Sequence, residues 1–185
     1  MKKNNILTLV ISAMFLALCM VLPLLTGQIK TIGNMLLPMH LPVLLCGLIC
    51  GWRYGAVVGA VAPIMRSAIF GMPVMFPNAF AMAFELATYG LVIGFLFSRA
   101  KHKNVKSLYG SLLVAMISGR VIWGFVQMCI LGLGEGGFTL TMFVTSSFLN
   151  SIPGIVLQIV LIPIIMLVLG KTKLVKFSVK QEEKL

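Results

Sequence analysis

The chain has no aspartate and only four acidic residues, against 15 lysines and arginines. The missing aspartates exclude the aspartate-rich motifs that bind metal-diphosphate substrates, and the G-x-S-x-G and H-E-x-x-H motifs of hydrolases are also absent. A Gly-Lys-Thr at 170–172 is not a phosphate-binding loop, because Ile165 stands where that loop needs its first glycine. The sequence therefore offers no support for an enzyme.

Charge of either sign is scarce, because charged residues make up 10% of the chain and hydrophobic residues 59%, with a mean hydropathy of +1.06. Soluble domains are about half apolar and a quarter charged, so these values indicate a membrane protein. We predict an all-α, polytopic membrane domain over residues 1–185, with a basic tail at 171–185. Apolar runs place six transmembrane helices at about 6–25, 35–52, 54–70, 77–98, 107–131 and 144–169.

The second and third helices are short and are joined at "GWRYG", which predicts one tight helical hairpin. Glycines at 47, 51, 55 and 59, and at 90 and 94, recur every four residues in this part of the chain, a spacing that lets helix backbones approach closely. Because the first series crosses a turn, we expect such contacts only from the pairs within one helix.

The basic residues fall on one side of the predicted helices. Twelve of them share that side: Lys2, Lys3, Arg53, Arg99, Lys101, Lys103, Lys106, Lys171, Lys173, Lys176, Lys180 and Lys184. The opposite loops carry only Lys30 and Glu135, so the positive-inside rule predicts that both termini are cytoplasmic. Topology and anionic lipid account for the net charge of +11, and no nucleic-acid partner is needed.

The potential metal ligands are four cysteines and one intramembrane histidine. Cys19, Cys46, Cys50 and Cys129 lie in apolar runs without a nearby acid or histidine, so we interpret them as small core residues. His40 could bind a metal, but a hydrogen bond to a neighbouring helix is the favoured interpretation. We therefore predict no metal site.

Strongly polar residues inside the membrane mark a candidate solute site. A charge at the bilayer centre costs at least about 2.5–3.5 kcal/mol, so such residues should point into the bundle. The predicted orientation places nearly all of them in the outer half, with Gln158 near the middle. The side chains expected at the site are His40, Arg66, Asn78, Glu85, Arg120, Trp123, Gln127 and Asn150. The alternative is that Glu85 pairs with Arg120 or Arg66 and binds nothing.

Helix 1 carries Ala13-x-x-x-Ala17, a small-residue spacing suited to a partner helix, and residues 37–63 read "LPMHLPVLLCGLICGWRYGAVVGAVAP". With six helices and cytoplasmic termini, these features over residues 6–169 resemble the substrate-binding S components of energy-coupling factor (ECF) vitamin transporters. The 37–63 segment is similar to the branch that takes up pantothenate, pyridoxine or hydroxymethylpyrimidine-type compounds.

The resemblance implies a subunit of the prokaryotic plasma membrane that captures a vitamin from outside. Such a subunit docks through helix 1, here through Ala13 and Ala17, onto a transmembrane coupling protein. Two cytoplasmic ATPase subunits hydrolyse the ATP, and this chain itself holds no cofactor. The resemblance also implies that residues 26–34 and 132–142 are the lids of the site.

The identity of the vitamin stays open at this stage. Two arginines against one glutamate would give a net positive pocket that suits a carboxylate such as that of pantothenate. An unpaired Glu85 would instead accept hydrogen bonds from a hydroxylated aromatic ring stacked on Trp123. An intramembrane enzyme and a purely structural subunit remain the alternative functions.

Overall fold

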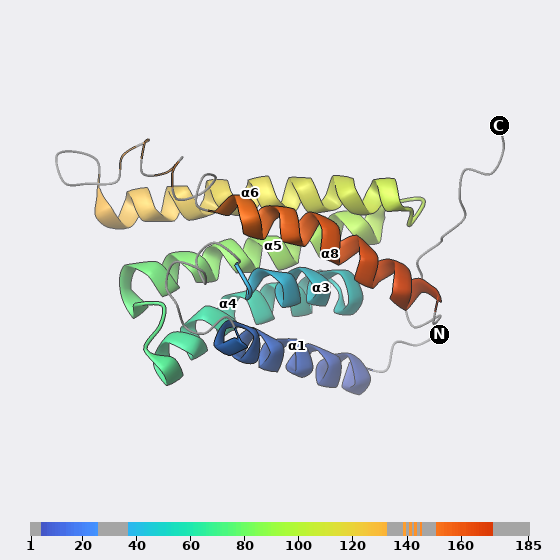
Figure 1. The fold of residues 1–185 in the computed structure, drawn as a ribbon, viewed down its shortest axis with the longest axis horizontal. Helices are drawn as coiled ribbons and strands as arrows, with labels where there is room; N and C mark the ends of the chain where they lie inside the picture. Colours follow the sequence, from blue (N-terminus) through green and yellow to red (C-terminus); the bar gives the residue numbers. More distant parts are fainter. Residues whose placement is uncertain are drawn as a thin grey trace.

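The computed structural model describes residues 5–25, 37–132, 139, 141, 143, 145 and 151–171, and the described part is helical, without strands. Figure 1 shows the helices lying side by side in one bundle. In chain order they are α1 (Asn5–Leu25), α3 (His40–Cys50), α4 (Trp52–Phe70), the short π-helix η1 (Met75–Ala79), α5 (Phe80–Arg99), α6 (Val105–Leu131) and α8 (Ile152–Lys171). The all-α prediction is therefore confirmed.

Each predicted span overlaps one α-helix, but only some of these helices are long and apolar enough to cross a membrane. Four segments of the described chain are long and apolar enough by length and composition: Asn5–Leu24, Met75–Arg99, Val105–Leu131 and Ile152–Gly170. α3 has 11 residues and is about 16 Å long, roughly half the hydrocarbon thickness. α4 has 19 residues but includes Arg53 and Arg66. α3 and α4 meet at Gly51, where the sequence predicts the hairpin.

Two helices begin later than the sequence predicts, and proline explains both positions. α3 begins at His40, not near residue 35, because Leu37 precedes Pro38 and has a positive φ of 48°. A proline disfavours helical backbone in the residue before it. α8 begins at Ile152, so that Pro153 falls in the first turn, where a backbone N–H has no helical partner to lose.

Glycines allow α3, α4 and α5 to touch through their backbones. A Cβ on Gly55 would lie 2.6 Å from the Cα of Gly47 and 2.9 Å from the carbonyl oxygen of Gly90. A Cβ on Gly90 would in turn collide with the carbonyl oxygen of Gly55. The close approach of helix backbones that the glycine spacing predicts is confirmed. It also extends across the α3–α4 junction, where the sequence did not predict it.

α5 is the centre of the bundle, because it packs against α3, α4 and α6. Its buried Leu86 and Ile93 join a core that includes Leu44 of α3 and Leu108 of α6. α1 covers α3 and α4, while α8 packs on α6 and α3. Of the four cysteines predicted in the core, Cys19, Cys46 and Cys50 are buried. Cys129 is instead exposed on the surface of α6.

The two ends of the bundle differ in character. The α3–α4 junction and the connection from α5 to α6 lie at the same end (Figure 1), and this end carries Arg53, Arg99, Lys101 and Lys103. α4 ends and α5 begins at the opposite end, whereas the short α3 begins near the middle of the bundle. The described basic residues outside the candidate site are thus gathered at one end, as the sequence predicts.

Candidate functional site

A buried ionic cluster joins α3, α5 and α6 around Glu85. The carboxylate oxygen Oε1 of Glu85 lies 2.9 Å from Nη1 of Arg120 and 3.5 Å from Nε2 of His40. The hydroxyl of Tyr89 donates a hydrogen bond of 3.1 Å to the same oxygen. Glu85 is only 2% exposed, so its charge is balanced inside the protein. The predicted pairing of Glu85 with Arg120 is confirmed, and the interpretation of an unpaired Glu85 is wrong. Whether the residues also bind a solute stays a prediction.

Local sequence explains how the cluster forms. Glu85 and Tyr89 are four residues apart on α5, so they share one helix face. Gly119 of α6 lies against the Tyr89 ring, where any Cβ would collide with it. The rings of Tyr89 and His40 are 5.3 Å apart between centroids. Sequence reasoning missed Tyr89, although its spacing from Glu85 was a signal that could have found it.

Several polar atoms at this site have no hydrogen-bond partner among the described residues. They are Nη2 of Arg120, Nδ1 of His40 and Oε1 of Gln127, whereas Nε2 of His40 faces Oε1 of Glu85. These side chains belong to residues that are at most 7% exposed. A buried polar group without a partner costs about 1–3 kcal/mol, and such groups are few in native proteins. The site therefore presents both donors and acceptors that a solute can use.

A second polar contact extends the site along α6. Nε2 of Gln127 donates a long hydrogen bond of 3.4 Å to Oδ1 of Asn78 on η1. Gln127 lies seven residues after Arg120, a rise of about 10 Å, so both fall on the same side of α6. The structure thus forms two groups of predicted residues: His40, Glu85 and Arg120 around one carboxylate, and Asn78 with Gln127 about two turns further along α6.

Arg66 faces a different neighbour. Its Nη1 donates a hydrogen bond of 3.1 Å to the carbonyl oxygen of Met20 on α1, and its guanidinium lies 5.4 Å from the centroid of the Phe70 ring. Pro23 interrupts α1 three residues after Met20. A cation near the C-terminal end of a helix is also favoured by the helix dipole. Among the described contacts, Arg66 connects α4 to α1 and not to Glu85.

The remaining predicted residues lie beside the cluster or outside the described chain. Trp123 stacks on Phe143, with ring centroids 6.5 Å apart and an angle of 25° between the planes. Asn150 and the predicted lid at 26–34 lie outside the described residues, as does most of the lid at 132–142. Gln158 of α8 is 1% exposed, and both of its amide atoms lack a partner in the described part of the chain. The sequence analysis placed Gln158 at mid-depth without assigning it to the site.

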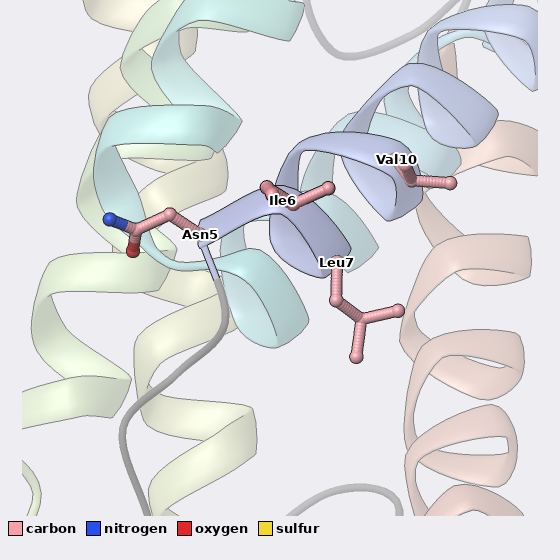
Figure 2. Close-up of a pocket in the computed structure, with 4 residues that line it drawn as sticks. All are labelled: Asn5, Ile6, Leu7 and Val10. Atoms are coloured by element: carbon pink, nitrogen blue, oxygen red, sulfur yellow. The ribbon is translucent and has the colours of Figure 1, made fainter.

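A shallow surface hollow elsewhere does not resemble a solute site. Figure 2 shows its four lining residues, Asn5, Ile6, Leu7 and Val10, all on the first turns of α1. Three of the four are apolar and exposed. The described residues also contain no group of three histidine, cysteine or acidic side chains that could hold a metal ion.

The comparison with known families decides the class of this bundle. The family described as "ECF transporter, substrate-specific component" matches residues 7–166. The chain belongs to this family. The match runs from the first turn of α1 to the last turns of α8, so this substrate-specific component includes every helix that contributes to the buried cluster. No curated protein and no solved structure matches the chain.

The family assignment bears out the sequence resemblance to S components. It identifies a membrane protein that serves as the substrate-binding subunit of a transporter, and the family is one of transport components rather than of enzymes. The four apolar helices long enough to cross a membrane agree with this class.

Proposed function

We propose that this substrate-specific component captures a small water-soluble vitamin from outside the cell and delivers it to an ECF-type ABC importer. The candidate solutes are pantothenate, pyridoxine or a related heterocycle. The observation that carries the proposal is the set of buried polar atoms without a described partner: Nη2 of Arg120, Nδ1 of His40 and Oε1 of Gln127. A solute that hydrogen bonds to them would remove the cost of burying them unpaired.

In this proposal, the residues of the site have distinct roles. Arg120, His40 and Gln127 contact the solute directly, and Asn78 orients the amide of Gln127. Glu85 holds the guanidinium of Arg120 in place. We expect Trp123 and Asn150 also to contact the solute, as the sequence predicts, and Arg66 to fix α1 against α4.

The proposed setting is the prokaryotic plasma membrane, with residues 1–185 forming one six-helix, multi-pass domain. The basic end of the bundle faces the cytoplasm together with both termini, as the positive-inside rule requires. The polar cluster then lies in the outer half of the bundle, on the side from which an importer receives its solute.

Gln127→Leu is expected to weaken solute binding by about 5- to 150-fold, because a polar group of the solute would lose its partner in a buried site, at about 1–3 kcal/mol. The solute that copurifies with the protein is first identified by mass spectrometry, and a panel of B vitamins is screened by thermal shift. Affinity of the wild type and the variant is then measured by calorimetry in detergent.

Ser118→Ala is the matched control on the same helix, since the Ser118 hydroxyl donates only to the Val114 carbonyl oxygen of its own helix, at 2.7 Å. This control should bind as the wild type does. A wild-type protein that no vitamin stabilises, and that carries no solute, would contradict the proposed function.

We also propose that α1 docks on a transmembrane coupling protein that works with two ATPase subunits. Ala13 and Ala17 are exposed in this chain and form a strip of small side chains between larger exposed residues such as Val10 and Met14. Such a strip allows a partner helix to approach closely.

Ala13→Trp or Ala17→Trp is expected to abolish uptake in cells while the purified protein keeps its solute affinity, because the indole would hold the partner helix away. Radiolabelled uptake and calorimetry measure the two effects separately. Leu18→Trp is the control, since Leu18 is also exposed on α1 but lies on another side of the helix. Normal uptake by both alanine variants would remove the docking role.

The Glu85–Arg120 pair favours a second candidate, in which the charged residues only hold helices together. In that case Gln127→Leu would change the stability of the protein without changing its affinity for any solute.

A further inference from the structure

The buried cluster contains opposite charges in equal number. Arg120 contributes one positive charge and Glu85 one negative charge, at 2.9 Å. His40 shares the same carboxylate oxygen, so a proton on His40 would set two buried positive charges against one negative charge. Gln127 and Asn78 are neutral amides. With a neutral His40, the described polar groups of the site have no net charge.

The second arginine does not change this balance. Arg66 bonds to the Met20 carbonyl of α1, and no described contact joins it to Glu85, Arg120 or Gln127. A net positive pocket that suits a carboxylate would require two arginines against one glutamate at the same place. The structure leaves one arginine there, and its charge is already matched.

From this balance we infer that the site takes an uncharged solute: a heterocyclic alcohol, an amide or a polyol, not a carboxylic acid. The inference deepens the proposed function and rests on it. A carboxylate would bring an unbalanced negative charge into a buried place, and burying such a charge is far more costly than burying a neutral group that finds hydrogen bonds.

The unpaired atoms also specify which hydrogen-bond donors and acceptors the solute needs. Nη2 of Arg120 is a donor, so it requires an acceptor such as a ring nitrogen, carbonyl or hydroxyl oxygen. Oε1 of Gln127 is an acceptor, so it requires an N–H or O–H group. The backbones of Arg120 and Gln127 are about 10 Å apart along α6. Because both side chains are long, one small substituted ring or short polyol amide can hydrogen bond to both.

Matched pairs of probes test this inference on the wild-type protein. The pairs are panthenol and pantothenate, nicotinamide and nicotinate, and pyridoxine and 4-pyridoxate, in which the second member carries a carboxylate. Calorimetry in detergent is expected to show that the neutral member of whichever pair binds is at least about 10-fold tighter. Equal or tighter binding of the acid would overturn the inference while leaving the proposed function intact. The failure of these probes and of every vitamin in the panel to bind would overturn both. Where another vitamin of the panel binds instead, an acid overturns the inference and an uncharged compound supports it.

Glu85→Gln tests the cause of the preference. The variant leaves the positive charge of Arg120 unbalanced, so the ratio of acid to neutral affinity should rise by about 10-fold or more over the wild type. Tyr89→Phe is the control, because it removes the hydrogen bond to Glu85 without changing any charge, and it should leave the ratio unchanged. An unchanged ratio in Glu85→Gln would overturn the inference. Should Glu85→Gln fail to fold, the wild-type ratio alone decides.

Discussion

Glu85→Ala lowers the free energy of unfolding by about 3–5 kcal/mol, the effect expected when one partner of a buried ion pair is removed. The variant leaves the guanidinium of Arg120 buried without its counter-ion, since Glu85 Oε1 is the carboxylate atom 2.9 Å from it. It also removes the acceptor of the Tyr89 hydroxyl. Unfolding by SDS in mixed micelles, followed by circular dichroism, measures the change.

The double variant Glu85→Leu/Arg120→Leu is the control for this prediction. It removes both charges and replaces them with apolar side chains, so most of the lost stability should return. The two sites are in contact, and a double-mutant cycle therefore gives their coupling energy directly. A Glu85→Ala protein as stable as the wild type would show that the pair does not hold α5 and α6 together.

Gly90→Ala is expected to destabilise the protein by about 1–3 kcal/mol or more, because overpacking forces a tightly packed region to shift. The added methyl group would collide with the carbonyl oxygen of Gly55, and main chain cannot move aside as a flexible side chain can. The same unfolding assay measures the effect, together with the amount of protein that enters the membrane.

Gly110→Ala is the matched control, since a Cβ on Gly110 of α6 meets nothing within 4 Å. Alanine is the better helix former by about 1 kcal/mol, so this variant should be as stable as the wild type or more so. Equal stability of the Gly90 and Gly110 variants would contradict the backbone contact between α4 and α5.

The sequence was sufficient to predict the all-α fold class, because long uncharged apolar runs bounded by lysine, arginine or glycine form helices in a membrane. Helix starts were less well predicted. The apolar run continues on both sides of Pro38, whereas α3 does not begin until His40. Proline restricts the dihedral angles of the residue before it, an effect that a count of apolar residues misses.

The sequence predicted the level of the site residues in the membrane, but not which neighbouring helix each side chain faces. Counting residues along a helix gives the level of a side chain, and by this measure Arg66 and Arg120 are both acceptable partners for Glu85. The choice depends on which helices are neighbours. α4 presents Arg66 to α1, whereas α6 presents Arg120 to α5. Which helices become neighbours depends on contacts far apart in the chain, such as those of Gly55 with Gly47 and Gly90, and a single sequence does not specify them.

The glycine contacts among α3, α4 and α5 have a mechanical consequence. Helices that touch main chain to main chain have no layer of side chains between them that could compress or adopt new rotamers. Their spacing is set by the van der Waals radii of backbone atoms. These three helices therefore have the least freedom to shift where their glycines meet, and a displacement that admits a solute is expected where side chains form the contact, at α1, α6 or α8.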